Sequence, residues 1–341
     1  THRVFQTQVA FARFGLAVVD EQHRFGVEQR LALHNKGVGA QTLPHQLMMS
    51  ATPIPRTLSM SYCADLDVSV IDELPPGRSP VVTKLIDVAR RDEVIERIRD
   101  ACAQGRQVYW VCPLIEANSD TLAAAEVKSL GKKKTSSANT RAGNRALELQ
   151  NVLDTHAQLS AIFPDLHVGL VHGRLKSAEK AATMAAFKAG DIQLLVATTV
   201  IEVGVDVANA SLMVIEHAER MGLAQLHQLR GRVGRGATQS ACILLYSPPL
   251  SALAKARLKV IFEHSDGFEI ARQDLALRGP GEFLGARQSG VPLLKIADLE
   301  RDVEHLDQAR EAALNLLRED AAAVEKHLKR WLARAEQYLK V

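Results

Sequence analysis

Aromatic residues and cysteines are scarce in this sequence. Aromatic residues make up 4% of the 341 positions, and there are four cysteines. The cysteines lack the paired spacing of a metal site, which predicts buried thiols in a reducing cytosol: Cys63, Cys102, Cys112 and Cys242. No apolar run approaches the ~20 residues of a membrane span, and the first residues do not have the pattern of a signal peptide. The sequence therefore argues against a disulfide-rich secreted domain and against a helical membrane protein.

An excess of one charge is also missing. The formal net charge is only +3, with 24% charged and 47% hydrophobic residues. This composition is typical of a soluble globular protein and does not by itself indicate a nucleic-acid partner, although a local basic face would be enough to contact phosphates. The length predicts two or more domains.

A phosphate-binding loop of the form G-x-x-x-x-G-K-[S/T] does not occur anywhere in the chain. Gly131 and Lys132, with Thr135 nearby, give a partial match. We reject it, because no glycine lies five positions before Gly131 and no predicted strand precedes the loop.

Two adjacent carboxylates follow a short apolar run near the start. Residues 16–19 are typical of a buried strand, and Asp20 and Glu21 come directly after it, with His23 close behind. Open α/β sheets bind ligands at the carboxyl ends of their strands. Paired acids at that edge suit Mg²⁺-nucleotide chemistry, since one can hold the metal through water and the other can activate an attacking water. A strand that ends in a solvated acidic turn is the alternative interpretation.

Three further motifs follow this acidic box in order. They are Ser50-Ala51-Thr52, the stretch 197–206 (Ala-Thr-Thr-Val-Ile-Glu-Val-Gly-Val-Asp) and the stretch 228–236 (Gln-Leu-Arg-Gly-Arg-Val-Gly-Arg-Gly). With the acidic box, they resemble the motifs of helicase superfamily 2: a DExH-type Walker B, the SAT motif, the motif with Gly-x-Asp, and Q-x-x-G-R-x-G-R. Each motif alone is moderately specific, and their common order argues against a chance match.

The resemblance narrows to the RecG family of branch-migrating DNA helicases. It extends over nearly the whole chain, except a segment around 120–148, and it rests on residues 25–27, 53–57, 72–78, 111–116, 266–268 and 285–290. The transcription-repair coupling factor Mfd shares much of this pattern, including the region near 257–290. The stretch 72–78, Asp-Glu-Leu-Pro-Pro-Gly-Arg, favours RecG over Mfd.

The resemblance implies ATP and Mg²⁺ as cofactors and points to the residues that would serve them. Asp20 and Glu21 would hold Mg²⁺ through water, with Glu21 activating the hydrolytic water. His23 would link the nucleotide site to the other half of the motor, although a purely structural role stays open. Gly204 and Asp206 would face the nucleotide.

The resemblance also implies an arginine finger. Arg232 and Arg235 are three positions apart. Gly231 and Gly234 have no side chains, which leaves space beside the backbone next to each arginine. Paired guanidinium groups can reach phosphate oxygens and stabilise a phosphoryl-transfer transition state. Gln228 would contribute to the same cleft. A basic surface helix is the alternative interpretation.

Several polar residues at predicted strand ends are candidates for DNA contact. Thr198 and Thr199 would bind phosphate, and His172-Gly173-Arg174 resembles a motif that touches the DNA backbone, although an ordinary strand-end turn fits those three residues equally well. The family often has a proline where this chain has Ala208.

Other residues are candidates for coupling hydrolysis to movement. Ser50 and Thr52 belong to the SAT motif, for which a simple helix cap is the alternative. Arg257, Arg278 and Gln288 match the positions of the family's translocation motif, a helical hairpin followed by a loop. Structural packing is the alternative for these three residues.

Alternating patterns from residue 81 onward predict a parallel sheet covered on both faces. The predicted strands are 81–86, 108–112, 167–171, 194–197, 212–216 and 241–246. The predicted helices are 90–103, 147–162, 177–189, 224–230 and 250–264, the first and third ending at Gly105 and Gly190. This doubly wound unit is similar to the second RecA-like domain of a helicase.

The predicted fold class is therefore α/β: a RecA-like parallel-sheet helicase motor, with part of domain 1, a complete domain 2 and a C-terminal helical extension. The expected boundaries are 1–78, 79–248 with a basic insertion at about 120–148, 249–297 for the translocation-motif hairpin and loop, and 298–341 for C-terminal helices. Apolar spacing after 298, including Leu317 and Leu328, predicts amphipathic helices with core-facing stripes. The start at Thr1, without an initiator Met, suggests by resemblance a C-terminal fragment that lacks Walker A and a wedge domain.

The function that the resemblance implies is an ATP-dependent double-stranded DNA translocase in DNA repair and recombination. The intact protein would remodel stalled forks and Holliday junctions, so branched DNA is the expected partner. Single-stranded DNA-binding protein is a further candidate partner, and a monomer in the bacterial cytosol, without a membrane, is expected. The fragment alone is expected to be inactive. An Mfd-like translocase and a non-catalytic DNA-binding fragment are the alternatives.

Overall fold

The computed structural model describes residues 78–113, 137–199, 207–236, 238–278 and 305–332, the stretches 14–21, 44–50 and 69–71, and positions 9, 11, 29, 33, 36, 73 and 302. The side chains of residues 137–149 and of a few helix-end positions, Arg278 among them, lie outside this description. The chain divides into two compact units, one made of residues 1–69 and 278–341 and the other of residues 70–277.

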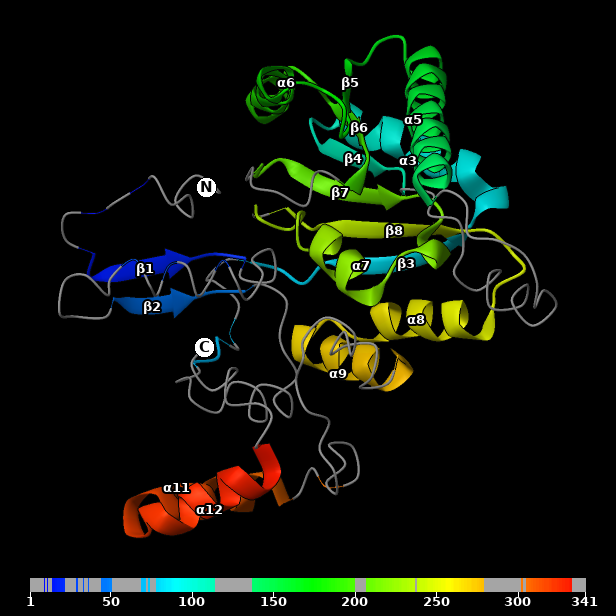
Figure 1. The fold of residues 1–341 in the computed structure, drawn as a ribbon. Helices are drawn as coiled ribbons and strands as arrows, with labels where there is room; N and C mark the ends of the chain where they lie inside the picture. Colours follow the sequence, from blue (N-terminus) through cyan, green and yellow to red (C-terminus); the bar gives the residue numbers. More distant parts are fainter. Residues whose placement is uncertain are drawn as a thin grey trace. The chain divides into compact units, whose positions relative to one another are not determined.

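A six-stranded sheet in the order β3-β8-β7-β4-β6-β5 forms the centre of the unit 70–277 (Figure 1). All of its strand pairs are parallel. The strands are β3 (Val82–Asp87), β4 (Gln107–Val111), β5 (Val168–Val171), β6 (Leu194–Ala197), β7 (Ala210–Ile215) and β8 (Ala241–Tyr246). The central strands β4, β6 and β7 are buried along their whole length. This agrees with their nearly continuous apolar sequences, which are typical of strands covered on both faces.

Helices cover both faces of the sheet, as the alternation of strands and helices predicts. On one face, α3 (Arg91–Ala103) and α5 (Ser137–Ile162) pack against alternate residues of the strands, with Val94, Val152 and Leu159 in that core. On the other face lie α6 (Ser177–Ala189), α7 (Leu223–Arg230), α8 (Ala252–Glu263) and α9 (Gly267–Arg278). The 3-10 turns η4 (Val88–Arg90) and η6 (Ala218–Arg220) complete the unit. The predicted doubly wound fold is therefore confirmed.

The long helix α5 departs from its predicted start. The structure begins α5 at Ser137, not near residue 147, so the interpretation of residues 120–148 as one patternless insertion is wrong for its last part. Residues 137–146 read Ser-Ala-Asn-Thr-Arg-Ala-Gly-Asn-Arg-Ala. Alanine and arginine favour helix strongly, but without large apolar residues they leave no stripe for a periodicity search to detect.

The other unit contains a short parallel sheet of β1 (Leu16–Val19) and β2 (His45–Met48). Ala17 and Val19 are buried with Leu33. Leu16 and Val18, on the opposite face of β1, are 58% and 56% exposed. The described part of this sheet therefore has a core on one face only.

Two helices near the end of the chain, α11 (Leu306–Glu319) and α12 (Ala321–Leu332), contact each other. Their existence was predicted, but the prediction of core-facing stripes is wrong at Leu317 and Leu328, which are 60% and 37% exposed. The amphipathic spacing predicted helices correctly. The spacing does not predict which surface, if any, covers the apolar stripe, because it carries no information about residues far away in the sequence.

Candidate functional site

The two predicted catalytic carboxylates lie at the carboxyl end of β1. The backbone N–H of Glu21 donates to Oδ1 of Asp20 over 2.8 Å, and Glu21 has φ = +54°. A positive φ is uncommon for a residue with a Cβ, and such conformations gather at functional sites. Asp20 is exposed, whereas Glu21 is half-buried and its Oε2 atom is fully buried.

Ser50 lies at the same edge of the small sheet. Val19 pairs with Met48 in the β1–β2 register, and the N–H of Met49 donates to the carbonyl of Val19 over 2.7 Å. Asp20, Glu21 and Ser50 therefore follow the same ends of two neighbouring strands. The predicted His23 and Thr52 lie outside the described residues.

Two carboxylates on adjacent residues offer oxygen atoms, which are suitable ligands for Mg²⁺. Magnesium prefers oxygen ligands and keeps several waters, so one or two carboxylates at a strand end are sufficient. Among the described residues no group of three potential metal ligands occurs. Asp20 and Glu21 remain the two residues predicted to hold the ion, through water.

A second group of predicted residues lies at the carboxyl edge of the large sheet. Val171 pairs with Ala197 in the β5–β6 register, so His172 and Thr198, which follow them, lie at the ends of neighbouring strands. The N–H of Thr198 donates to the carbonyl of Val171 over 3.1 Å. Thr198 and Thr199 are 4% and 8% exposed. The hydroxyl of Thr198 is buried and has no hydrogen-bond partner among the described residues.

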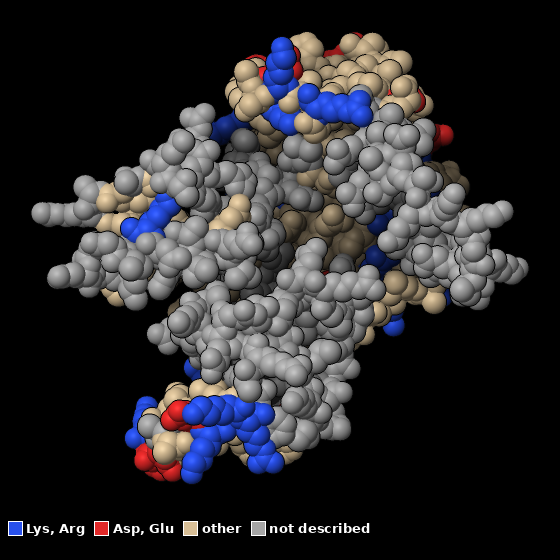
Figure 2. Space-filling model, viewed as in Figure 1, with Lys and Arg blue, Asp and Glu red and all other residues tan. Residues whose placement is uncertain are grey.

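The turn after β5 is basic and held by its own hydrogen bonds. The N–H of Arg174 donates to Nδ1 of His172 over 3.2 Å, and Nζ of Lys180 donates to the carbonyl of Gly173 over 2.9 Å. Burial, together with the charges of Lys180 and Arg174, lowers the pKa of His172, which favours the neutral imidazole. Figure 2 shows lysine and arginine atoms exposed over α6, the helix that follows this turn. The turn can therefore present positive charge to a phosphate without a charged histidine.

A third group lies at the opposite, amino edge of the large sheet. Arg232 and Arg235 lie in the loop after α7, the first half-buried and the second exposed. A Cβ added at Gly236 would lie 2.5 Å from the carbonyl oxygen of Ala208, so the end of this loop lies directly against the turn before β7. Gln228 is half-buried within α7 itself.

The described residues on either side of 200–206 lie at opposite edges of the sheet. Thr198 follows β6 at the carboxyl edge, whereas Val207 to Asn209 precede β7 at the amino edge, where the carbonyl of Asn209 accepts from the N–H of Gln107 over 3.1 Å. Gly204 and Asp206 themselves lie outside the described residues.

Arg230, the last residue of α7, connects this helix to another part of the domain. It is 5% exposed, and Nη1 donates to the carbonyls of Ile261 and His264, each over 2.9 Å. Nη2 donates to the carbonyl of Ser265 over 3.1 Å. These oxygens belong to the end of α8 and the turn before α9, so the buried guanidinium ties α7 to the helical hairpin α8–α9.

His227 completes the surroundings of Arg230. Nδ1 of His227 lies 3.1 Å from Nη2 of Arg230. Burial, and then the charge of Arg230, lower the pKa of His227 to about 4, so the imidazole is neutral at pH 7 and Nδ1 accepts the hydrogen bond.

A second contact joins α8 to the rest of the domain. Nη2 of Arg257 donates to the carbonyl of Glu219, in η6, over 3.2 Å. Burial opposes ionisation of Glu219, but its interactions with His217 and the N–H of Ser247 prevail and hold its pKa below the ordinary value. Of the other two predicted coupling residues, the structure places the backbone of Arg278 at the end of α9, and Gln288 lies outside the described residues.

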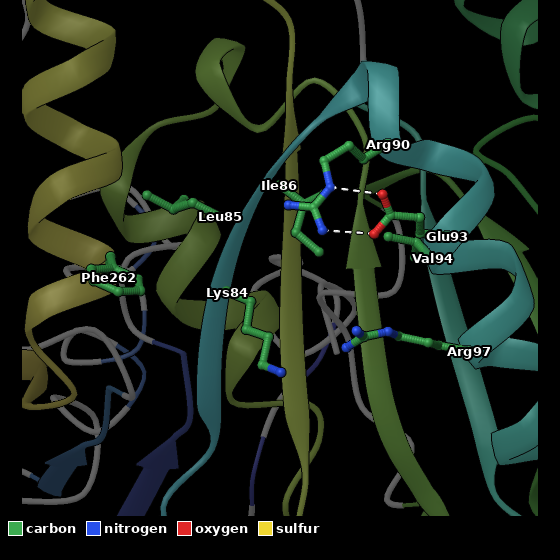
Figure 3. Close-up of a pocket in the computed structure, with 8 residues that line it drawn as sticks. All are labelled: Lys84, Leu85, Ile86, Arg90, Glu93, Val94, Arg97 and Phe262. Carbon is green, nitrogen blue, oxygen red and sulfur yellow. Dashed lines mark hydrogen bonds and ion pairs between the residues drawn. The ribbon is translucent and has the colours of Figure 1, made fainter.

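A hollow of about 280 Å³ lies beside β3 and contains none of the predicted residues (Figure 3). Oxygens of Glu93 accept from Nε and Nη2 of Arg90 over 2.9 Å and 2.6 Å at its rim. The lining residues are Lys84, Leu85, Ile86, Arg90, Glu93, Val94, Arg97 and Phe262. The predicted chemistry therefore does not lie in this hollow.

The sequence analysis missed Arg230. Its neighbours in the motif, Arg232 and Arg235, were selected because glycines flank them, whereas the partners of Arg230 lie more than thirty positions away along the chain. A basic residue on the buried side of α7, between the core residues Leu226 and Leu229 and the arginine loop, was the available signal.

Two family models match the chain. Residues 93–237 match the helicase conserved C-terminal domain, and residues 264–334 match the model described as ATP-dependent DNA helicase RecG, domain 3, C-terminal. Within the described residues no helix is long and apolar enough to cross a membrane.

Curated relatives match over almost the whole chain. The chain is 53% identical over 338 residues to the ATP-dependent DNA helicase RecG of Acidithiobacillus ferridurans, and 51% identical over 339 residues to the RecG of Escherichia coli K12. Both alignments cover 99% of this chain and 45% of the relative, so the chain spans about half the length of these proteins. A solved structure of RecG bound to a three-way DNA junction is 41% identical with a TM-score of 0.62, covering 90% of this chain and 35% of that one.

Proposed function

Because the chain belongs to the RecG family of ATP-dependent DNA helicases, we propose that it works as a segment of an ATP-driven double-stranded DNA translocase. In this proposal residues 70–277 act as the second motor domain, and Asp20, Glu21 and Ser50 belong to the first. The phosphate-binding loop that the chain does not contain would come from the rest of the first domain.

The observation that carries this proposal is the separation of two polar groups on one RecA-like sheet. Arg232 and Arg235 lie at the amino edge, beside the turn at Ala208, and His172 and Thr198 lie at the carboxyl edge. A motor needs one surface that binds the nucleotide and another that binds DNA, so that hydrolysis at the nucleotide surface can change the affinity for DNA. The amino edge offers positive charge to a nucleotide. The carboxyl edge offers hydroxyl groups and basic side chains to DNA.

The proposed mechanism assigns one action to each group. Bound Mg²⁺ would screen the phosphate charges, and Asp20 and Glu21 would orient the water around it. Glu21 would take the proton of the attacking water. Arg232 and Arg235 would donate to the phosphate oxygens, where charge builds up in the transition state. At the other edge, Arg174 would hold the DNA backbone, and Thr198 and Thr199, which are buried in this structure, would have to become exposed to join it.

We propose branched DNA, at stalled forks and Holliday junctions, as the substrate. The support is the match to the RecG domain 3 model and the similarity to RecG solved with a three-way junction. The same match favours this assignment over an Mfd-like translocase. We also propose that the protein acts as a cytoplasmic monomer with single-stranded DNA-binding protein as a further partner, which rests on the family resemblance alone.

The experiment that tests the proposal compares the 341-residue chain with the full-length enzyme. We expect the full-length enzyme to show ATP hydrolysis stimulated by three-way junction DNA and to unwind a model fork. We expect the chain alone to show no appreciable turnover, since the loop that cradles the β- and γ-phosphates is missing from its sequence. Robust hydrolysis by the chain, abolished by Glu21→Gln, would contradict this division of the nucleotide site.

A further inference from the structure

Arg78, which lies shortly before β3, forms hydrogen bonds with the loop that carries Arg232 and Arg235. Its Nε donates to the carbonyl of Gly234 over 3.0 Å, and its Nη2 donates to the carbonyl of Gly231 over 3.3 Å. The two carbonyls flank Arg232 and Val233, so one half-buried guanidinium spans the middle of the loop. More than 150 positions separate Arg78 from these partners along the chain.

Arg78 adds to the hydrogen bonds that the loop makes itself, among them one over 3.5 Å from Nε of Arg235 to the carbonyl of Gly231. Helix α7 ends at Arg230, which leaves carbonyls beyond it without partners in the helix. The N–H of Arg232 still donates to Leu229 over 2.9 Å, but that of Val233 donates to Arg230 over 3.4 Å. The carbonyls of Gly231 and Gly234, further on, are the ones that Arg78 satisfies.

The backbone of the loop is also shaped to receive this contact. Gly234 has φ = +79°, a conformation that residues with a Cβ rarely adopt. A Cβ added there would lie 2.7 Å from Cγ2 of Val81, so the strand that follows Arg78 already fills the space beside the loop. Residues 78–81 and the loop therefore pack closely along a shared face.

We propose that Arg78 is a positioning residue that holds the loop 231–235 in the conformation from which Arg232 and Arg235 act. This inference rests on the proposed role of those two arginines in ATP hydrolysis. Arg78 is the last residue of the predicted first domain, directly before the predicted start of the second domain at residue 79. A residue at this predicted boundary thus contacts the arginine loop.

The geometry also specifies the type of side chain. A guanidinium offers several donors in a fixed fork and can reach two carbonyls at once, whereas a lysine ammonium on a flexible stem acts as a single point. Arg78→Lys should therefore keep part of the effect, and Arg78→Ala should lose all of it.

Arg106 provides a matched control. Its Nε donates to Oγ of Ser211 over 2.7 Å and its Nη2 to the carbonyl of Gln239 over 2.9 Å. It is another arginine that bridges two segments at the amino edge of the same sheet, but it does not contact residues 231–235 in these bonds. Arg106→Ala reports the cost of losing such a bridge without disturbing the arginine loop.

The test uses the full-length enzyme and measures junction-stimulated ATP hydrolysis, thermal unfolding and backbone hydrogen exchange of peptides covering 229–236. For Arg78→Ala we expect kcat to fall by about tenfold to a hundredfold, as for a displaced catalytic group, with KM for ATP nearly unchanged. We expect faster exchange in 229–236, partial rescue by Arg78→Lys, and normal kcat for Arg106→Ala. In an Arg232→Ala/Arg235→Ala background, Arg78→Ala should lower kcat no further, because both arginines through which it acts are already removed.

Other results would overturn the inference. Normal kcat in Arg78→Ala, or a further loss of kcat in the Arg232→Ala/Arg235→Ala background, would show that Arg78 does not act through these two arginines. If the Arg232→Ala enzyme hydrolyses ATP at the normal rate, the arginine-finger assignment fails. Hydrogen exchange then decides whether Arg78 holds the loop 231–235. Faster exchange in Arg78→Ala would still support a loop held by Arg78, and unchanged exchange would contradict it.

Discussion

The guanidinium of Arg230 and the carbonyl of His264 are joined by a hydrogen bond of 2.9 Å that connects α7 to the hairpin α8–α9. Arg230 is two positions before Arg232, and His264 is the first residue after α8, in the turn that leads to α9. The buried side chain of Arg230 therefore connects the start of the predicted arginine loop to the predicted translocation hairpin.

Replacing Arg230 should destabilise the domain strongly. Arg230→Ala would leave the buried carbonyls of Ile261 and His264 without their donor, and each unsatisfied group costs about 1–3 kcal/mol. Arg230→Lys should cost less, since an ammonium can still reach one of them. Urea unfolding of the 341-residue chain measures both changes. Arg99→Ala, which removes an exposed bond to the carbonyl of Ile162, is the control, and an equal loss in all three variants would contradict the assigned role.

Arg257→Ala should separate two activities of the full-length enzyme. The contact between Arg257 and the carbonyl of Glu219 holds α8 against η6, and we infer that the hairpin passes motor closure on to the DNA. ATP hydrolysis on fork DNA should persist within a few-fold, while unwinding of the same fork should fall by roughly tenfold or more. We expect the same pattern for Arg278→Ala and Gln288→Ala.

Both activities must be measured on one preparation, together with a melting curve. Lys259→Ala is the matched control for Arg257→Ala, because Lys259 lies on the same helix and makes only an exposed pair with Glu263 at 3.9 Å. Parallel loss of hydrolysis and unwinding would mean that Arg257 supports the fold or the nucleotide site instead.

Local patterns in the sequence predicted most of the large sheet. The strands at 194–197 and 241–246 and the helix at 177–189 were predicted to the residue. Their signals are local: buried apolar runs define the strands, and Gly190, with φ = +93°, ends the helix. The start of α5 was missed, since its first residues carry no apolar stripe.

Long-range polar contacts could not be predicted in the same way. The partners of Arg78 and Arg230 come from other elements of the fold, and no local pattern reveals which carbonyls a guanidinium will meet. The motifs selected Arg232 and Arg235 by type and spacing, but not the side chains around them. The exposure of Leu317 could not be predicted for the same reason: an amphipathic stripe does not specify which surface packs against it.

Removing residues 122–134 should leave the fold of the second domain intact. The segment is basic in sequence, with four lysines against one glutamate, and long insertions in surface segments cost little stability. The deletion ends before Ser137 and so preserves all of α5. Thermal unfolding of the full-length enzyme should be unchanged, and a large drop in the melting temperature would show that the segment supports the core.

The same deletion also tests whether the segment contacts DNA. Replacing Lys132, Lys133 and Lys134 by glutamine, without a deletion, isolates the charge from the length. If the lysines bind phosphate, both variants should weaken junction binding and reduce its dependence on salt concentration.

His227 should make the stability of the domain sensitive to acid. Its pKa is about 4 in the folded chain, because of burial and Arg230, against an ordinary value of 6.5. Between these values the unfolded state binds more protons than the folded state, so the free energy of unfolding falls as the pH falls from 6.5 toward 4. The slope from one such group is at most about 1.4 kcal/mol per pH unit.

Denaturant unfolding of the chain across this pH range measures the effect. His227→Asn keeps an acceptor for Arg230 but cannot be protonated, so its curve should be flatter than that of the unsubstituted chain. His305→Asn, at the exposed start of α11, is the control. Identical slopes for His227→Asn and the unsubstituted chain would rule out the histidine as the cause.

The most direct measurement for the whole account is the single-turnover rate of ATP hydrolysis by the full-length enzyme on junction DNA, for Arg232→Ala. A finger arginine acts mainly in the transition state, so the rate should fall by about 10³ while nucleotide binding stays nearly unchanged. Arg99→Ala, an exposed arginine on α3, should hydrolyse ATP normally. A near-normal rate for Arg232→Ala would contradict the assignment of the amino-edge loop to the nucleotide.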